Sequence, residues 1–341
     1  MYDLVFVTHI PAFYKINLYN GIAKKENIFV IFISKNTSEL RADDFVPLAS
    51  ALFDFKVLDV DNFQSRNKMK SCYALIKTLN SLTYKRIIVG GWDLPEFWLV
   101  LAWAHKSKLS VALESTINES KSTGIAGFIK KIFLARISLV FASGKLHVDL
   151  LNALNYTGET RITSGVGLIN KPSFTPSEKK YSKTFLFVGR LSDEKNIIKL
   201  VLVFNTIPDY QLTIVGEGPL EELLKKLALD NTKIVGNVKN KNLPPYYLAN
   251  DFLILPSARE PWGLVVEESL YFGTPVIVSE QCGASELIVD GENGFIFDSL
   301  NFDSLKILLV SIDVEKFTTI KVASLSTINY KDLKQISCYE L

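Results

Sequence analysis

The chain has 341 residues, 48% of them hydrophobic and 22% charged, a composition typical of a globular protein with apolar material for two cores. Its net charge of +2 argues against a nucleic-acid-binding protein. The three cysteines, Cys72, Cys282 and Cys338, have the spacing of neither a disulfide framework nor a zinc site, so we expect a reducing, cytoplasmic environment.

The first half of the chain alternates between apolar, β-branched segments and amphipathic stretches. Strands are predicted at residues 3–9, 28–34, 55–60, 86–91, 109–115 and 138–144. Helices are predicted between them, at residues 14–25, 70–82, 95–108, 124–137 and 145–154. Because the strands are apolar on both faces, the alternation indicates a parallel sheet covered by helices on both sides.

No targeting or membrane-spanning segment is predicted in this half. The start, MYDLVFVTHIPAF, has no basic residue before its short apolar run and is predicted to be a strand rather than a signal peptide. The most apolar helical stretch, FWLVLAWA, is about half the length needed to span a bilayer. We therefore expect a soluble protein, peripheral on a membrane at most.

A polar stretch rich in Pro, Ser and Lys, residues 170–183, interrupts the pattern and is interpreted as an interdomain linker. The alternation of strands and helices then restarts and continues to about residue 300. The prediction is two doubly wound, Rossmann-like α/β domains, residues 1–169 and 184–325, followed by a helix at 326–341. The ligand is expected in a cleft at the carboxyl ends of the strands.

Four loops of the second half follow a strand and precede a helix, so a doubly wound sheet would bring them to one rim. In the first, FVGRLSDEKN, Gly189 ends the strand, and Arg190 and Lys195 supply two cations near a helix start. Such a pair suits a pyrophosphate, because Arg binds two oxygens at once and Lys is a compact charge. Solvation of both, or pairing of Lys195 with Asp193 or Glu194, is the alternative.

The second and third loops expose main chain. In IVGEGPL, Gly216 and Gly218 permit a close backbone approach before a helix, although the third glycine of a dinucleotide fingerprint is missing. In IVGNVKN, the main chain near Gly236, Asn237 and Val238 can hydrogen-bond a nucleobase edge.

The fourth loop, in EPWGLVVEE, places Glu260 before a proline and therefore outside the following helix. The amides of Gly263, Leu264 and Val265 then fall at the helix start, where unpaired N–H groups and the helix dipole bind anions.

The same helix carries two neighbouring carboxylates. Glu268 lies about a turn and a half into the helix, where a carboxylate can accept from ribose hydroxyls. Glu267 is rotated about 100° away and is predicted to be solvated. Compensation of the helix dipole is the alternative role of such acidic residues.

These motifs, VGRLSDEKN, IVGEGPL, GNV and ILPSAREPWGLVVEESLYFGTPVIVS, with GASELIVDGENGFIF after them, resemble the donor domain of retaining, nucleotide-sugar-dependent glycosyltransferases of the GT-B architecture, family four. The resemblance covers residues 183–300 in the family's order. The start, THIPAFYKINLYNGIAK, is more loosely similar to the acceptor domain of members that build bacterial cell-surface polysaccharides, lipopolysaccharides or glycolipids.

The resemblance implies two domains facing across a cleft, with the final helix crossing back to the first domain. It implies that Arg190 and Lys195 bind the donor diphosphate, that Glu260 lies beside the donor sugar and that Glu268 holds the ribose. The amides from Gly263 to Val265 would serve the phosphate and the sugar.

The acceptor domain departs from the family pattern, because HIPAFYK replaces the paired-glycine loop of many members. Many members also carry a His that faces the donor sugar; His105 is nearest in position but is predicted on a helix surface. We instead predict catalytic roles for His9, Asp93 and Glu114, because each ends a strand, with helix capping as the alternative for each.

No cofactor and no metal are expected, because Arg190, Lys195 and a helix terminus can stabilise a leaving diphosphate. The one acidic D-x-D motif, Asp59-Val60-Asp61, follows a strand of the first domain, far from the phosphate-suited loops.

The segment at residues 121–138 combines apolar residues with Lys121, Lys130, Lys131 and Arg136. A basic amphipathic helix of this kind can lie on an anionic membrane or pack its apolar face into its own domain. Residues 1–170 carry 20 basic against 14 acidic residues, which favours an anionic partner for this half.

The predicted function is therefore retaining transfer of a sugar from a nucleoside diphosphate sugar to a hydroxyl of a glycan or lipid-linked acceptor. The expected location is the cytoplasm or the inner face of the membrane, without nucleic acid. Two alternatives remain: a non-catalytic nucleotide-sugar-binding subunit, and a GT-B epimerase or phosphorylase. A nicotinamide dehydrogenase is disfavoured because no G-x-G-x-x-G follows the first strand of either domain.

Overall fold

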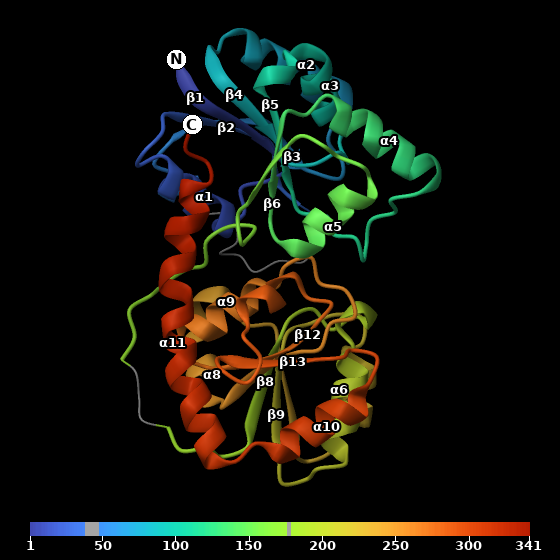
Figure 1. Ribbon diagram of the computed structural model, residues 1–341, viewed down its shortest axis with the longest axis vertical. Coiled ribbons are helices and arrows are strands. Elements are labelled where there is room, and N and C mark those ends of the chain that lie inside the picture. The colour runs from blue at the N-terminus through green and yellow to red at the C-terminus, as the bar shows by residue number, and fades with distance from the viewer. Residues whose placement is uncertain (38–47, 176–178) are drawn as a thin grey trace. The chain divides into compact units, whose positions relative to one another are not determined.

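The computed structural model describes residues 1–37, 48–175 and 179–341 (Figure 1). The chain forms two compact α/β units, each built on one parallel sheet, so the predicted fold class is confirmed. Unit 1 comprises Met1–Asn170 and Asp332–Leu341, and unit 2 comprises Lys171–Lys331. Residues 176–178 of the expected linker lie outside the described residues.

Within its described residues, unit 1 contains a seven-stranded parallel sheet. Its strands, in spatial order, are β3 (Asp54–Asn62), β2 (Ile28–Asn36), β1 (Tyr2–Thr8), β4 (Tyr84–Val89), β5 (Leu109–Leu113), β6 (Leu139–Ala142) and β7 (Glu159–Ile162). Its helices are α1 (Phe13–Ile22), α2 (Lys68–Asn80), α3 (Pro95–Trp103), α4 (Gly124–Ala135) and α5 (Lys145–Ala153).

The sheet of unit 1 is covered on both faces because alternate residues of each strand point to opposite sides. In β1, Val5 and Val7 pack with the inward residues of α2, α3, α4 and α5. Leu4 and Phe6 pack on the other face, against α1 and Tyr339 near the C-terminus.

Three elements of unit 1 differ from the sequence-based expectation. Strand β7 was not predicted, because its sequence, ETRI, is polar and at most half-buried. Helix α3 ends at Trp103, so His105 lies outside it and caps a short 3-10 helix, η3 (Lys106–Lys108). The Asp59–Asp61 motif lies within β3 instead of following it.

Helix α4 is apolar on two sides. Its inward residues Phe133 and Leu134 are buried, and the Phe133 ring lies 5.0 Å from that of Trp98 on α3. Its large apolar side chains on the other side are exposed, so the helix packs only part of its apolar surface into the domain, as the second of the two alternatives expected.

The described part of unit 2 contains a six-stranded parallel sheet. Its strands, in spatial order, are β10 (Thr232–Gly236), β9 (Gln211–Val215), β8 (Thr184–Val188), β11 (Phe252–Leu255), β12 (Val276–Ser279) and β13 (Gly294–Phe297). Its helices are α6 (Ile197–Asn205), α7 (Glu221–Leu227), α8 (Pro244–Ala249), α9 (Leu264–Tyr271), α10 (Phe302–Ser311) and α11 (Val314–Ser337).

Both sheets begin with the same strand order, in which the first strand lies between the second and the fourth. The connections therefore run in opposite directions from β1 and β4 in unit 1, and from β8 and β11 in unit 2. In doubly wound folds the ligand binds in the crevice at the carboxyl ends of the two strands where this direction changes.

The end of α11 and the residues that follow it belong to unit 1. Tyr339 is buried there and stacks on Phe141 of β6, with 4.4 Å between ring centroids. Arg161 of β7 donates to the backbone oxygens of Cys338 and Glu340 at 3.0 and 2.9 Å. Among the described residues, no helix is both long and apolar enough to cross a membrane.

Candidate active site

The crevice of unit 2 brings Lys195 and Glu260 into contact. Lys195 lies in the 3-10 turn η4 (Asp193–Lys195) after β8, and its ammonium donates to the carboxylate of Glu260, in the loop after β11. Their side chains are 18% and 13% exposed. The alternative in which Lys195 pairs with Asp193 or Glu194 is wrong, because the ammonium pairs with Glu260. Glu194 instead accepts a hydrogen bond from the hydroxyl of Ser192.

Two more hydrogen bonds join these loops. The amide of Ala258 donates to the backbone oxygen of Glu194 at 2.8 Å, and Asn196 Nδ2 donates to the backbone oxygen of Pro256 at 3.1 Å. Asn196 has a positive φ of 53°, a conformation that Asn tolerates better than most residues. The Lys195–Glu260 pair is therefore held by the main chain on both sides.

The loop after β9 packs directly on the loop after β8. A Cβ atom at Gly216 would lie 1.8 Å from the oxygen of Gly189, and one at Gly218 would lie 2.5 Å from that of Leu191. The amide of Leu191 also donates to the backbone oxygen of Glu217 at 2.9 Å. The two glycines are required by this close backbone approach, which brings the rim loops together.

The loop before α9 is fixed from the side of β12. Gly263 begins the helix with a φ of 99°, and the amide of Gly283 donates to the backbone oxygen of Glu260 at 3.0 Å. The thiol of Cys282 and the amide of Ala284 both donate to the oxygen of Trp262 at 2.8 Å. Sequence reasoning missed this support, although the GAS tripeptide after a strand is its visible signal.

The amides in the first turn of α9 point out of the N-terminal end of the helix. The N–H groups of Gly263, Leu264 and Val265 have no acceptor within the helix, because the first four N–H groups of an α-helix lack one. With Lys195 on the neighbouring loop, they can bind an anion.

Glu268 lies in a polar, buried position on α9. It is 5% exposed, and its carboxylate accepts from Asn240 Nδ2 at 2.9 Å and from the hydroxyl of Tyr247 at 2.6 Å. Burial, and then the adjacent carboxylate, raise the pKa of Tyr247 well above its usual range, so this hydroxyl remains a donor. The sequence did not predict Asn240 and Tyr247 as partners of Glu268. The contact of Glu268 with a ribose stays a prediction.

Glu267 is a correction to the sequence-based prediction, because it is fully buried rather than solvated. Its carboxylate accepts from Trp262 Nε1 and from Lys331 Nζ, both at 2.5 Å. Lys331 is itself only 5% exposed. The indole and the ammonium thus take the place of water as hydrogen-bond donors to the buried carboxylate of Glu267.

The remaining predicted donor residues surround this rim. Arg190 is exposed immediately after Gly189, where β8 ends. Asn237 is exposed after β10 and donates to the carboxylate of Glu217 at 3.0 Å, and Val238 beside it is half-buried. The predicted residues of unit 2 thus lie in loops at the carboxyl edge of the sheet or within the first turn and a half of α9.

The crevice of unit 1 also holds an ionisable pair. His9 Nε2 lies 2.8 Å from Asp93 Oδ2, joining the residue after β1 to the loop after β4. Burial by itself would raise the pKa of Asp93, but the hydrogen bond and charge of His9, with Lys15 nearby, lower it below its ordinary value. Asp93 therefore stays ionised, and the imidazole keeps a fixed orientation.

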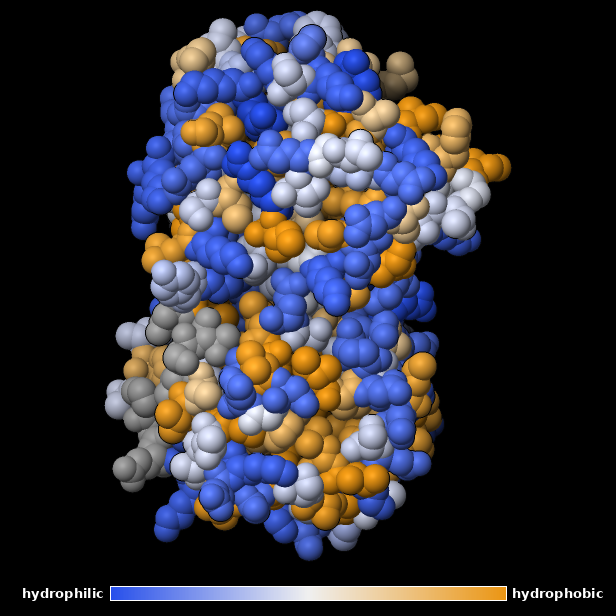
Figure 2. Space-filling view, viewed as in Figure 1, coloured by the Kyte–Doolittle hydropathy of each residue, from blue (hydrophilic) through white to orange (hydrophobic). Residues whose placement is uncertain are grey.

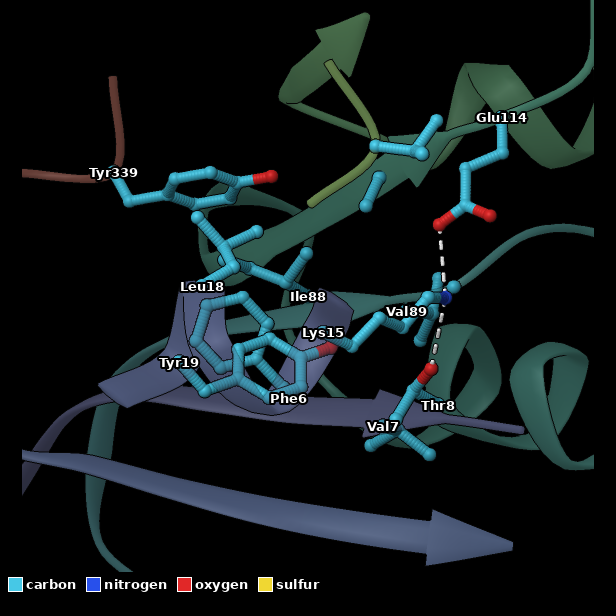
Figure 3. Close-up of a pocket in the computed structure, with 13 residues that line it drawn as sticks. Phe6, Val7, Thr8, Lys15, Leu18, Tyr19, Ile88, Val89, Glu114 and Tyr339 are labelled. Atoms are coloured by element: carbon cyan, nitrogen blue, oxygen red, sulfur yellow. Dashed lines mark hydrogen bonds and ion pairs between the residues drawn. The ribbon is translucent and has the colours of Figure 1, made fainter. Parts of the chain in front are cut away.

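Glu114, at the end of β5, pairs with Lys15 of α1 (Figure 3). Lys15 Nζ lies 2.8 Å from Glu114 Oε1 and donates to Thr8 Oγ1 at 3.2 Å. Burial lowers the pKa of Lys15 by itself, but the carboxylate of Glu114 outweighs it and raises this pKa. The pair borders a pocket with about 20 Å³ of space, also lined by Tyr19 and Tyr339.

Lys15 was missed by sequence reasoning; its only signal is a lysine on the inner side of an otherwise apolar helix start. A second missed residue, His147, lies in the first turn of α5 and is fully buried. Neither of its ring nitrogens has a hydrogen-bond partner within the described parts of the chain. Burial lowers the pKa of His147 to about 4, although the charge of Glu114 opposes this.

Two other candidates lie apart from these crevices. His105 is exposed and bonds to Ser107 through Nδ1 at 2.8 Å. Asp59 and Asp61 belong to β3, the edge strand of unit 1. Within residues 1–37, 48–175 and 179–341, no cluster of His, Cys, Asp or Glu has the arrangement of a metal site.

A family model described as "Glycosyl transferases group 1" matches residues 170–311. An uncharacterised 41.2 kDa protein in the cps region of Klebsiella pneumoniae is 30% identical over 322 residues, which cover 94% of this chain and 79% of the relative. The chain belongs to the group 1 glycosyl transferases.

Two further proteins are similar to this chain, one in sequence and one in fold. The lipopolysaccharide core biosynthesis glycosyltransferase LpsE of Rhizobium meliloti is 29% identical over 42% of each chain. The crystal structure of Anabaena Alr3699/HepE in complex with UDP and glucose superposes with a TM-score of 0.73 at 17% identity, covering 99% of this chain and 98% of that one. The group 1 glycosyltransferase described here thus has the GT-B fold, as expected from its sequence motifs.

Proposed function

We propose that this glycosyltransferase moves a sugar from a nucleoside diphosphate sugar to a hydroxyl of a glycan or lipid-linked acceptor, with retention of the anomeric configuration. The observation that carries the proposal is the contact of Lys195 with Glu260 across the crevice of unit 2. One loop supplies a cation for the diphosphate, and the other supplies a carboxylate for the sugar.

The diphosphate is proposed to bind Arg190, Lys195 and the first amides of α9. An ammonium has three N–H donors, so Lys195 can keep its bond to Glu260 and still donate to phosphate oxygens. These groups stabilise the charge that develops on the leaving phosphate, which is the largest single contribution in many enzymes. No metal is required in this scheme.

Glu260 is proposed to position the donor sugar, and Glu268 the ribose. The main chain holds Glu260 through Gly283, so its carboxylate stays at the rim beside Lys195. Glu268 would accept from a ribose hydroxyl in exchange for Asn240 or Tyr247. The leaving phosphate takes the acceptor proton in this front-face displacement.

Unit 1 is proposed to bind the acceptor through His9, Asp93 and Glu114, which lie at the carboxyl edge of its sheet. We also propose a role in bacterial cell-surface polysaccharide or lipopolysaccharide synthesis, on the cytoplasmic face of the membrane. The relatives named for the cps region and for lipopolysaccharide core biosynthesis support this assignment.

The first test is a thermal-shift screen with UDP-, GDP-, dTDP-, ADP- and CMP-sugars. A ligand that binds only the folded protein at 100 times its Kd adds about 2.7 kcal/mol to stability, so one class of nucleotide should raise the melting temperature of unit 2. If no donor raises it, the donor site is wrong. Binding without turnover would instead identify a donor-binding subunit.

The second test separates the two carboxylates. Glu260→Gln should lower the rate of donor turnover about 100-fold or more while the donor still raises the melting temperature. Glu268→Gln should weaken donor affinity roughly 10-fold, because the amide removes one acceptor for the ribose. The matched control is Glu222→Gln, at an exposed position of α7. Equal effects of all three substitutions would contradict the assigned roles.

The stereochemical course is read from the product. With the preferred donor, the new anomeric proton in an NMR spectrum should show the configuration of the donor sugar. The opposite configuration would refute retention and leave donor binding intact.

A further inference from the structure

Helix α4 of unit 1 presents an apolar stripe to solvent. The stripe consists of Ile125, Phe128, Ile129 and Ile132, which are 82%, 64%, 45% and 48% exposed. Their spacing of three, four and seven residues places all four on one side of the helix. Figure 2 shows orange residues in the region where α4 projects from unit 1 in Figure 1, among other apolar residues on this face.

The stripe is exposed although the other side of α4 is well packed against unit 1. The opposite side is anchored by buried Phe133, and Arg136 at the C-terminal end donates to the backbone oxygens of Leu101 and Ala104 on α3. Lys130 is held inward, donating to Ser120 and to the oxygen of Lys121. The helix is therefore fixed in an orientation that keeps the stripe exposed.

Basic residues surround the stripe. Lys121 and Lys131 are exposed at the start and on the flank of α4, and Lys106 is exposed beyond the end of α3. Trp103, which ends α3, is 49% exposed. Residues 103–136 contain six basic side chains against two acidic ones, and α4 has no acidic residue.

We propose that α4 docks unit 1 onto the surface of an anionic lipid bilayer. The apolar stripe would enter the boundary between headgroups and acyl chains, while the lysines bind lipid phosphates. Trp103 suits the same layer, because its ring is apolar and its N–H is polar. The helix lies on the surface, since no described helix can cross the membrane.

A second copy of the chain fits this surface less well than a lipid layer. A stable protein interface buries about 800 Å² per partner, from roughly 20–30 residues on each side, whereas the stripe has four residues on one projecting helix. Two copies that paired through α4 would also bring lysines against lysines. An anionic bilayer supplies the opposite charge and needs no matching shape.

This inference deepens the proposed membrane location and rests on that part of the proposed function. It is tested by co-sedimentation of the full chain with vesicles of phosphatidylcholine alone and of phosphatidylcholine with 30% phosphatidylglycerol. Wild type should bind the anionic vesicles at least about 10-fold more tightly, and less so above about 0.5 M salt, where screening is strong.

Ile125→Ser with Phe128→Ser should lower the affinity for anionic vesicles about 10-fold or more. The matched control is Ile307→Ser with Val310→Ser, which removes two side chains, 71% and 54% exposed, from α10 of unit 2 and should leave binding unchanged. Lys121→Gln with Lys131→Gln should abolish the preference for anionic over neutral vesicles.

Three results would overturn the proposal: no preference for anionic vesicles in the wild type, equal losses for the α4 and α10 variants, or a fall in oligomeric mass of the α4 variant with vesicle binding unchanged. The last would assign the stripe to self-association. Donor-induced melting shifts, measured on every variant, should stay at the wild-type value, so a failed donor site is recognised separately.

Discussion

Lys195 and Glu260 are 65 positions apart, yet they form one hydrogen-bonded pair. His9 and Asp93, which are 84 positions apart, do the same in unit 1. The sequence predicted that each of these residues follows a strand, because apolar strands end in visible polar loops. It did not predict the pairing, which depends on the two strands being neighbours in the sheet.

At the residue scale, the buried imidazole of His147 makes stability depend on pH. Its pKa is about 4 in the folded chain and about 6.5 when unfolded, so between these values the unfolded state binds more protons. Unfolding free energy should therefore fall as pH decreases through 6.5, by about 2 kcal/mol between pH 7.5 and 5. The contribution becomes constant below the folded pKa.

His147→Gln should remove this part of the pH dependence. The measurement is denaturant unfolding followed by tryptophan fluorescence at the two pH values, with His105→Gln, at an exposed position, as control. A His147→Gln profile as steep as that of wild type would show that this imidazole is not buried in its neutral form.

At the element scale, α9 carries neighbouring carboxylates with different partners. Glu268 faces Asn240 and Tyr247, whereas Glu267 faces Trp262 and Lys331 of α11. The helical period correctly separates the two side chains by direction. The period could not show that the Glu267 side chain points at α11, because α11 lies more than 40 positions downstream in the sequence.

The Glu267–Lys331 pair is expected to hold the loop of Trp262 against α11. Lys331→Met removes the ammonium that pairs with the buried carboxylate of Glu267 and should destabilise unit 2 by about 3–5 kcal/mol. Combining it with Glu267→Gln removes that charge, keeps an acceptor for the indole and should recover most of the loss. Denaturant unfolding of the three variants measures this, and a double variant no more stable than Lys331→Met would contradict the pairing.

At the scale of the whole molecule, the chain returns to unit 1 after completing unit 2. Tyr339 packs on Phe141 and borders the pocket beside Lys15 and Glu114. The acceptor unit proposed here is thus completed only by the last residues of the chain.

Tyr339→Ala should therefore destabilise unit 1 by about 3–5 kcal/mol, as removal of a large buried aromatic side chain usually does. Tyr330→Ala, on the preceding helix α11 and 81% exposed, is the control and should change stability by less than about 0.5 kcal/mol. Thermal unfolding with and without donor tests this: the donor-dependent shift of unit 2 should persist. Equal effects of both substitutions would show that Tyr339 is not part of the core.

The sequence by itself determined the strand–helix alternation, the doubly wound class and the rim positions of residues such as Arg190 and Gly263, because periodicity, turn chemistry and strand ends are local properties. Only the tertiary structure decided that Lys195 meets Glu260, that Lys15 meets Glu114 and that Glu267 is buried. It also decided that one apolar side of α4 faces solvent. The partners and the burial of a side chain depend on which distant segments become neighbours in space, and local sequence patterns do not specify those neighbours.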